Sequence, residues 1–219
     1  MPAPHSPTGQ DPELHRVAHI YNEIAPSWDK RQGLVERILM GQAMRTALVS
    51  HLHGDVLEVG TGTGPTLRLL EHNHHINEFT GVDLSTGMLA RARAHVVGIP
   101  FPVQLIEGNA EALPVPDASF DTVTTSLMLC TVPDPARALR EMARACRPGG
   151  RIVILEHVRA RNPFLAWLQR TLTPMQVRML GCHLDRPTNQ LVRDLGFTVE
   201  HEQERCFGIF RLMVLQLPA

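Results

Sequence analysis

Glycine occupies every second position in a short loop that directly follows an apolar run. The stretch DVLEVGTGTGPT places Gly60, Gly62 and Gly64 after residues 56–59, a run that carries one acid, Glu58. Glycine adopts positive φ at little cost and lets a ligand approach the main chain. The dinucleotide-binding fingerprint is G-x-G-x-x-G, whereas here the third glycine comes one residue early and the acid would repel a pyrophosphate. The loop therefore favours a cationic or amino-bearing ligand, and a purely structural turn is the alternative.

Polar and polarisable residues follow the next two apolar runs. Asp83 comes 21 residues after Gly62, where an acid is well placed to bond both ribose hydroxyls of a nucleoside. Met88 is suited to lie against an adenine ring, and the Asn109 amide is suited to pair with an adenine edge. Each has a structural explanation as well: a helix cap, a core position and a turn, respectively. Together with the loop, they favour a nucleoside that carries an amino acid.

His157 is the candidate general base. It ends the apolar run 151–157, and imidazole titrates near neutral pH. A histidine hydrogen-bonded to the backbone is the alternative. Ser126 and Cys130, near the end of another apolar run, are expected to face the same space, and His183 is a weaker candidate for the base.

No metal site is predicted. His72, His74 and His75 stand together, but apart from Glu71 no carboxylate or cysteine flanks them at ligand spacing, so a solvated surface is expected. The four cysteines are far apart in the sequence and form no C-x-x-C motif. This spacing indicates reduced thiols rather than disulfides or a zinc site.

These residues fall at the ends of strand-like runs that alternate with helical segments. The predicted strands are 55–59, 79–83, 103–107 and 151–157, with a further strand contained in 120–129. A predicted helix begins with residues 65–72, and three more cover 85–96, 135–146 and 186–196. Two further strand-like runs close the chain. The alternation predicts an α/β fold with a parallel sheet covered on both faces, in which ligands bind at the carboxyl ends of the strands.

Four motifs resemble those of the class I S-adenosylmethionine-dependent methyltransferases. EVGTGTG, GVDLSTGML, EGNAEALPVPDASFD and CRPGGRIVILEHV occur in the family's order over about residues 55–160. The resemblance implies a Rossmann-like, seven-stranded, mostly parallel sheet with helices on both faces and a closing antiparallel strand pair. It also implies S-adenosyl-L-methionine as the cofactor and S-adenosyl-L-homocysteine as the product.

The same resemblance implies roles for single residues. The glycine loop meets the methionine part of the cofactor, with Glu58 nearby, and Tyr21 lies over the cofactor. Asp83 binds the ribose, and Asn109 meets the adenine together with the residue after it. Many family members have aspartate at the position of Asn109, and an amide can still accept the adenine amino proton. The full set predicted to bind the cofactor is Tyr21, Glu58, Gly60, Thr61, Gly62, Gly64, Asp83, Leu84, Met88, Asn109, Ala110 and Ser126.

Residues 157–184 contain four arginines and no acid among many apolar residues. Two functional interpretations are a lid over a lipophilic substrate and, within 158–180, an interfacial patch for an anionic membrane. The alternative is a core helix with extended arginines. Pro163 and Pro174 are expected to interrupt the helical pattern.

Further resemblance bears on the methyl acceptor. LMLCTV, RPGGRIVILEHV and GCHLDRPTNQLVRDLGF resemble the microsomal alkyl-thiol methyltransferases and their bacterial relatives, which implies a small lipophilic acceptor, first of all a thiol. Phospholipid amine and quinone methyltransferases share much of this pattern. Two alternatives come from other classes: a non-catalytic protein that binds the cofactor, and a nicotinamide oxidoreductase, against which the early third glycine and Glu58 speak.

The 219 residues divide into a disordered amino terminus, 1–12, and a single methyltransferase domain, 13–219. Within the domain we expect amino-terminal helices in 13–53, the cofactor-binding core in 54–157, the lid or substrate-side insertion in 158–185, and a helix and two strands in 186–219. The net charge of −1 gives no reason to expect nucleic acid as a partner. No signal peptide or membrane-spanning run is recognisable, so a cytoplasmic protein is predicted, with or without peripheral membrane contact. No oligomeric state is predicted.

Overall fold

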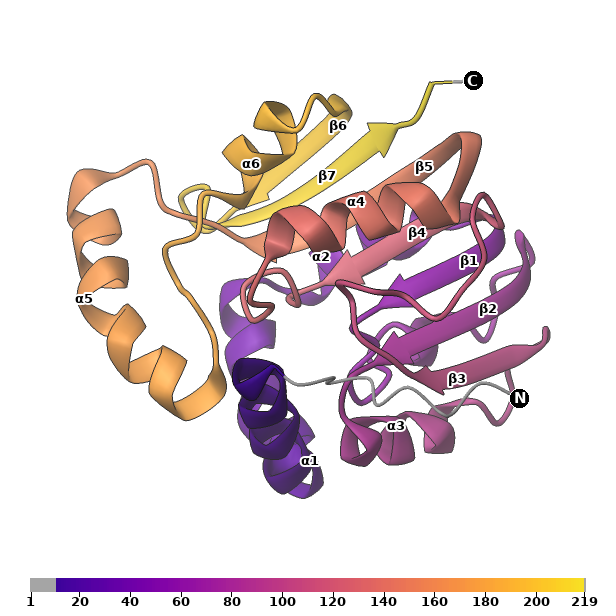
Figure 1. Cartoon of the computed structure of the whole chain (residues 1–219), viewed down its shortest axis with the longest axis horizontal. Coiled ribbons are helices and arrows are strands. Elements are labelled where there is room, and N and C mark those ends of the chain that lie inside the picture. The colour runs from indigo at the N-terminus through magenta and orange to yellow at the C-terminus, as the bar shows by residue number, and fades with distance from the viewer. Residues whose placement is uncertain (1–10, 219) are drawn as a thin grey trace.

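The computed structural model describes residues 11–218, and for residues 31–39 the backbone alone. Within this part of the chain the strands form a seven-stranded sheet in the order β3-β2-β1-β4-β5-β7-β6 (Figure 1). The strands are β1 (Gly54–Val59), β2 (Ile76–Asp83), β3 (Val103–Glu107), β4 (Phe120–Ser126), β5 (Cys146–His157), β6 (Thr198–Arg205) and β7 (Phe210–Gln216).

The strand directions confirm the predicted fold class. β1 pairs in parallel with β2 and β4, β2 pairs in parallel with β3, and β4 does so with β5. In contrast, β7 runs antiparallel to both β5 and β6. Because β1 has β2 on one side and β4 on the other, the order of the strands reverses there. Such a switch point opens a crevice at the carboxyl ends of the strands.

β5 shows why the sheet must be covered on both faces. Ile152 and Ile154 belong to one buried apolar cluster, whereas Val153 and Leu155 belong to another, and all four side chains are fully buried. Successive side chains of a strand point to opposite faces of the sheet. The continuous apolar run in the sequence is therefore the pattern of a strand that is buried on both sides.

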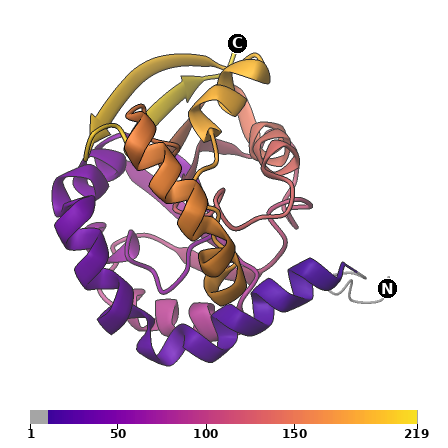
Figure 2. The same ribbon diagram turned by 90° about the vertical axis from the view of Figure 1, so that its left-hand side faces the viewer.

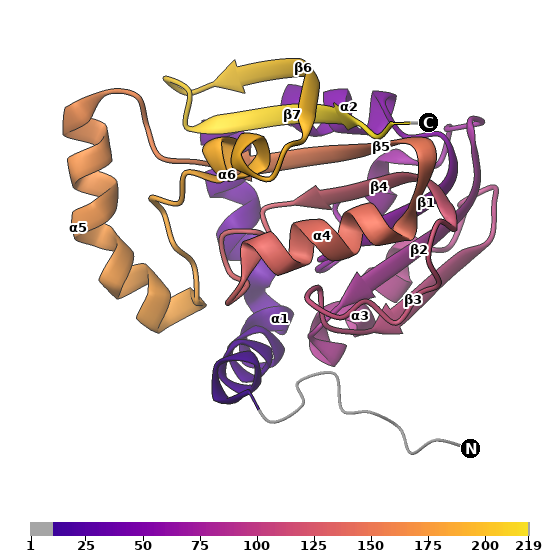
Figure 3. The same ribbon diagram turned by 45° about the horizontal axis from the view of Figure 1, so that its top comes forward.

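Helices provide these two covers. They are α1 (Pro12–Leu39), α2 (Gln42–Ser50), α3 (Thr86–Ala92), α4 (Pro135–Ala145), α5 (Pro163–Leu180) and α6 (Thr188–Asp194). Leu139 of α4 and Val192 of α6 pack in one cluster, and Leu48 of α2 and Ala92 of α3 pack in the other. Figure 3 shows α4 and α6 in front of the sheet and α2 behind it.

Two predicted helices are shorter than expected. The segment that follows the glycine loop forms one 3₁₀ turn, Leu67–Leu69, rather than a helix through 65–72. Leu67 and Leu70 are both fully buried, and a spacing of three residues suits a 3₁₀ turn. α3 ends at Ala92 and passes into a second 3₁₀ turn, Arg93–His95.

α5 is one continuous helix, so the expected interruption by proline is wrong. Pro163 occupies its first turn, where a missing backbone donor costs little. The side chain of Asn162 caps this turn by accepting hydrogen bonds from the backbone amides of Phe164 and Leu165. The helix continues through Pro174 and ends before Gly181, whose φ is 67°.

α1 and α5 lie beside the carboxyl ends of the strands rather than in the two covering layers. α1 contacts both α3 and α5. Figure 2 shows α5, in orange, running across this end of the domain. The disorder expected for 1–12 lies outside the described residues except at its end, where Pro12 already begins α1. Among the described helices, none is long and apolar enough to cross a membrane.

Candidate active site

A cavity of about 570 Å³ lies at the carboxyl ends of the strands. The residues around it come from α1, from the loops that follow β1, β2, β3, β4 and β5, and from α5. The predicted site residues that line it are Tyr21, Gly60, Thr61, Gly62, Asp83, Leu84, Met88, Asn109, Ala110, Ser126 and His157. Within the described chain, the predicted residues Glu58 and Gly64 lie outside this lining.

The three loop glycines all have positive φ but serve different contacts. A β-carbon on Gly60 would lie 2.5 Å from the Met128 side chain, and one on Gly64 would lie 3.3 Å from Ala92. At Gly62, with φ 58°, a β-carbon would meet no described atom within 4 Å. Gly60 and Gly64 thus permit close packing, while Gly62 leaves the main chain open to a ligand in the cavity.

Asp83 ties the glycine loop to the end of β2. Its Oδ2 accepts a hydrogen bond from the Gly62 amide at 2.7 Å, and its Oδ1 accepts one from the Ser85 amide at 2.9 Å. Burial raises the pKa of Asp83, and these two amides oppose the rise. Ser85 caps α3 by accepting from the Met88 amide. The carboxylate is therefore held in a fixed position on the cavity wall.

Glu58 lies beneath the loop rather than in the cavity. It is 1% exposed, and its Oε1 accepts a hydrogen bond from the Thr66 hydroxyl at 2.5 Å. Its Oε2 is buried and has no hydrogen-bond partner among the described residues. Burial raises the pKa of Glu58 to about 7, although Thr66 and the nearby Arg45 act in the opposite direction. Glu58 therefore does not contact the cavity itself. It supports the residues of the glycine loop and, when ionised, places a negative charge beneath them.

α1 closes one side of the cavity and is hydrogen-bonded to the residues that follow β2. The Asn22 Oδ1 accepts hydrogen bonds from the Ser85 hydroxyl at 2.7 Å and from the Gly87 amide at 2.8 Å. Tyr21, the residue before Asn22, lines the cavity, and its ring centroid lies 5.4 Å from that of Trp28. Tyr21 was predicted from the sequence, whereas Asn22 and Trp28, which lie in the same stretch YNEIAPSWD, were not.

Asn109 and Ser126 each have a hydrogen-bond partner inside the protein. The Asn109 Oδ1 accepts from the Glu111 amide at 2.9 Å, so this residue shapes the turn after β3 as well as lining the cavity. The Ser126 hydroxyl accepts from the Arg45 guanidinium at 3.2 Å. Arg45 comes from α2 and also lines the cavity. Arg45 was not predicted as a site residue, because no local sequence pattern distinguishes a buried arginine on a helix from an exposed one.

His157 lies in a cluster with two cysteines. Its Nε2 is 3.3 Å from the Cys182 sulfur. Together with Cys130, the three ligand atoms all lie within 4.8 Å of one another, so these residues could hold a metal ion. The cysteine Cys130 and the imidazole of His157 lower the pKa of Cys182. Burial acts to lower the pKa of His157, and Cys182 and Glu156 raise it above its ordinary value.

The cluster was not expected from the sequence, which predicted no metal site. Cys182 comes from the segment after α5, 52 residues beyond Cys130. His183, the weaker candidate base, does not line the cavity in the described structure. His72, His74 and His75 are exposed, as expected.

Comparisons with known proteins show the family of the chain. The family described as "Methyltransferase domain" matches residues 57–154. The phosphatidylethanolamine N-methyltransferase of Cereibacter sphaeroides is 36% identical over 71% of this chain and 77% of its own length. A demethylmenaquinone methyltransferase of Roseiflexus castenholzii is 33% identical over 78% of this chain and 74% of its own. The chain belongs to the class I S-adenosylmethionine-dependent methyltransferases.

Solved structures show the same fold. The [4+2]-cyclase SpnF superposes with a TM-score of 0.74 at 18% identity, covering 95% of this chain and 98% of its own. An S-adenosylmethionine-dependent methyltransferase of Mesorhizobium loti gives a TM-score of 0.62 at 25% identity, covering 80% of this chain and 96% of its own. The likeness to the cyclase concerns the fold alone.

The cavity suits S-adenosylmethionine as the cofactor of this family. Gly62 leaves open main chain on the cavity wall, and Asp83 offers a fixed carboxylate beside it. Glu58 places a buried acid beneath the same loop, where it favours a cationic ligand. When bound, the cofactor supplies a methyl group on a sulfonium ion.

Proposed function

We propose that the chain transfers this methyl group to the polar head of a lipophilic acceptor that enters the cavity along α5. The observation that carries the proposal is the outer wall of the cavity, where α5 contributes the apolar side chains of Leu165, Leu168, Leu172 and Leu180. Apolar walls with a few placed polar groups are typical of sites for lipophilic small molecules.

A phospholipid amine is the first candidate acceptor, because the relative from Cereibacter sphaeroides carries that activity in its name. The thiol predicted from the sequence is the second candidate, since the half-buried Cys182 and His157 line the same cavity as the leucines of α5. Quinols form the third group to test, because the Roseiflexus castenholzii relative is named a demethylmenaquinone methyltransferase.

The residues of the chain have three tasks in such a transfer. The loop at Gly62 and the carboxylate of Asp83 would orient the cofactor, and the leucines of α5 would exclude water. In-line displacement depends on alignment of this kind, which can contribute about 7–11 kcal/mol. His157 stays our predicted base for an acceptor that arrives protonated, because it lies on the same cavity wall.

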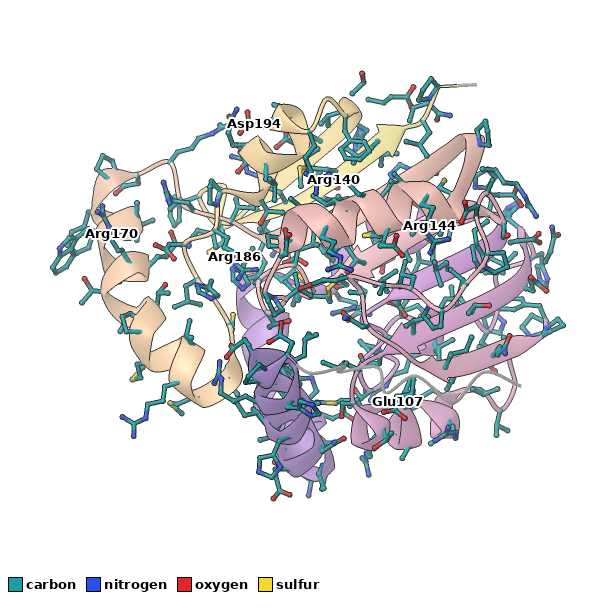
Figure 4. The ribbon with its side chains drawn as sticks, viewed as in Figure 1. Glu107, Arg140, Arg144, Arg170, Arg186 and Asp194 are labelled. Atoms are coloured by element: carbon teal, nitrogen blue, oxygen red, sulfur yellow. The ribbon has the colours of Figure 1, made fainter. Side chains whose placement is uncertain are left out.

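We further propose that the outer face of α5 contacts an anionic membrane from which the acceptor is taken. Four of its apolar side chains are more than half exposed: Phe164 (67%), Trp167 (55%), Met175 (52%) and Met179 (59%). Residues 157–184 add four arginines and no acid, so the charge of this surface complements anionic headgroups. Arg170, labelled in Figure 4, belongs to this helix.

The test is a methyl-transfer screen with radiolabelled cofactor against phosphatidylethanolamine vesicles, a lipophilic thiol and a quinol. We expect label in the lipid fraction from one of the three acceptors. We also expect His157→Ala to lower turnover far more than cofactor affinity. Cofactor binding without transfer to any acceptor would overturn the proposal in favour of a non-catalytic S-adenosylmethionine-binding protein.

A further inference from the structure

We propose that Cys130, His157 and Cys182 form a zinc site on the acceptor side of the cavity, with the fourth coordination position open to the cavity. The three residues come from the segment after β4, the end of β5 and the segment after α5. All three line the cavity. Two cysteines and one histidine with one open position are a known ligand set of catalytic zinc.

The distances suit one tetrahedral ion. With Zn–S bonds of about 2.3 Å and Zn–N bonds of about 2.0–2.1 Å, ligand atoms in a tetrahedral site lie about 3.5–3.8 Å apart. Here the His157 Nε2 and the Cys182 sulfur are 3.3 Å apart, and all three ligand atoms lie within 4.8 Å of one another. Side-chain adjustments of well under an ångström per ligand would bring the three atoms around a single ion.

The backbone that carries Cys130 is held in place by the buried carboxyl group of Glu156 and the half-buried Arg186. The Glu156 Oε1 accepts hydrogen bonds from the amides of Met128 and Leu129, both at 2.7 Å. The Arg186 guanidinium donates to the carbonyl oxygens of Leu129 and Val132, both at 2.6 Å. Figure 4 shows Arg186 between α5 and the body of the domain. These contacts fix the segment before and after Cys130.

The two other ligands are tied to the same framework. The His183 amide donates to the Cys130 carbonyl oxygen at 2.9 Å, which joins the segment of Cys182 to that of Cys130. Gln169 of α5 donates to the carbonyl oxygens of Val158 and Leu184, at 3.0 and 2.9 Å. A metal site needs ligands that are held in place by such supporting contacts.

Charge also favours an ion in this place. Zinc with two thiolates and a neutral imidazole carries no net charge, so it tolerates the apolar wall better than an isolated ion would. Binding would release two protons from the cluster for each ion. The His157 Nδ1 is buried and has no hydrogen-bond partner among the described residues, whereas Nε2 is turned toward the cysteines.

The consequence for methyl transfer rests on the proposed function. A thiol that takes the open position on zinc would release its proton to water. The resulting thiolate would form the new S–C bond as the S–CH3 bond of the sulfonium breaks, giving a thioether and S-adenosyl-L-homocysteine. The zinc-bound Nε2 has no free electron pair, so His157 would act as a base only in the metal-free protein. Zinc would thus favour the thiol among the candidate acceptors.

The test measures metal binding itself, without an acceptor. Protein stripped with a chelator under reducing conditions is titrated with Co²⁺ and then with Zn²⁺. We expect one ion per chain, thiolate-to-cobalt charge-transfer absorption, and displacement of cobalt by zinc. Cys182→Ser, at a half-buried position, and His157→Gln should each weaken zinc binding at least about 100-fold. Cys146→Ser is the matched control, since Cys146 is a buried cysteine at the start of β5.

Two results would overturn the inference. One is zinc binding by Cys182→Ser that equals that of the original chain, with circular dichroism showing that both are folded. The other is absence of the cobalt charge-transfer band although thiol titration finds Cys130 and Cys182 reduced. Zinc binding without methyl transfer would support the zinc site and contradict only the proposed function. Methyl transfer to a thiol by zinc-free protein would contradict only the proposed role of zinc in the transfer.

Discussion

At the scale of single residues, Asp83 connects the sequence pattern to the cavity. Its carboxylate accepts two backbone hydrogen bonds, one of them from Gly62 in the glycine loop. Hydrogen bonds to a charged group contribute about 1.5–3 kcal/mol each. Asp83 therefore both organises the loop and presents its charge to the ligand, which explains why the spacing of 21 residues was informative.

We expect Asp83→Ala to weaken S-adenosylmethionine binding by at least about 100-fold while the protein remains folded, because the variant loses both the loop anchor and the predicted ribose contact. Asp83→Asn, which keeps one acceptor oxygen, should lose less. Isothermal titration calorimetry measures the affinity, and thermal unfolding checks the fold. Glu78→Ala, at an exposed position of the same strand, is the control. Unchanged affinity in Asp83→Ala would remove the ribose assignment.

Glu58 predicts how stability depends on pH. Its pKa of about 7 in the folded protein lies above the ordinary value of 4.5. Between these values the folded protein keeps a proton that the unfolded chain has released, so the contribution is fully present below pH 4.5 and is lost as the pH rises through about 7. The shift corresponds to a change on the order of 3 kcal/mol. The charged groups that act on Glu58 are Arg45 and Asp83.

Glu58→Gln removes this titration and keeps an oxygen for Thr66. We expect the cofactor-free variant to be more stable than the original chain at pH 8, by about 1–3 kcal/mol, and nearly equal at pH 5. Urea unfolding at the two pH values measures the difference, with Glu78→Gln as the control. Cofactor affinity at pH 8 should fall, since Glu58 is charged there and a buried negative charge beneath the loop is lost. An identical pH dependence in both proteins would show that Glu58 is not the titrating group.

At the scale of elements, α5 is the helix whose position the sequence did not reveal. Its leucines line the cavity, and Phe164, Trp167, Met175 and Met179 are more than half exposed. Exposed apolar side chains gathered on one helix mark an interaction surface. The rest of the described chain does not cover these side chains. The arginines of residues 157–184 favour an anionic partner surface.

Replacing Phe164 and Trp167 together by serine should weaken binding to anionic vesicles by at least about tenfold, because burying a large apolar side chain contributes about 1.5–3 kcal/mol. Sedimentation with vesicles of phosphatidylglycerol and phosphatidylcholine measures binding. Val97→Ser is the control, since Val97 is 88% exposed and lies outside α5. Equal binding by the double variant and the original chain would remove α5 as the membrane contact.

At the scale of the whole molecule, the cavity is built by parts of the chain that are far apart in sequence. α1, the loops of the sheet and α5 all contribute walls. A ligand that fits between these parts joins them in one folded unit. Binding to the native state alone stabilises a protein by about 2.7 kcal/mol at one hundred times the dissociation constant.

We therefore expect saturating S-adenosylmethionine or S-adenosylhomocysteine to raise the melting temperature by about 5–10 °C. Differential scanning fluorimetry measures the shift. A nicotinamide dinucleotide serves as the control ligand and should produce no shift, because Glu58 and the early third glycine disfavour a pyrophosphate. A larger shift with the nicotinamide cofactor would contradict the assignment of the glycine loop.

Much of the cofactor side could be predicted because its information is local. The strand that ends at Gly60, the acid at the end of β2 and the turn at Asn109 each show in a few consecutive residues, and parallel strands bring their carboxyl ends to one edge. The same reasoning did not show that Glu58 lies beneath the loop, since alternation along β1 does not tell whether a residue next to the loop points into the cavity or beneath it.

The sequence by itself determined the fold class through its alternating segments, and the cofactor through four motifs that resemble those of a known family, because both kinds of signal lie within short segments. Only the tertiary structure decided that Cys130, His157 and Cys182 meet, that Asn22 fastens α1 to α3, and that α5 lies over the cavity. These contacts join distant segments and leave no periodic trace, because one side chain from each segment is enough to make them. The residues on the acceptor side of the cavity therefore could not be predicted from the sequence alone.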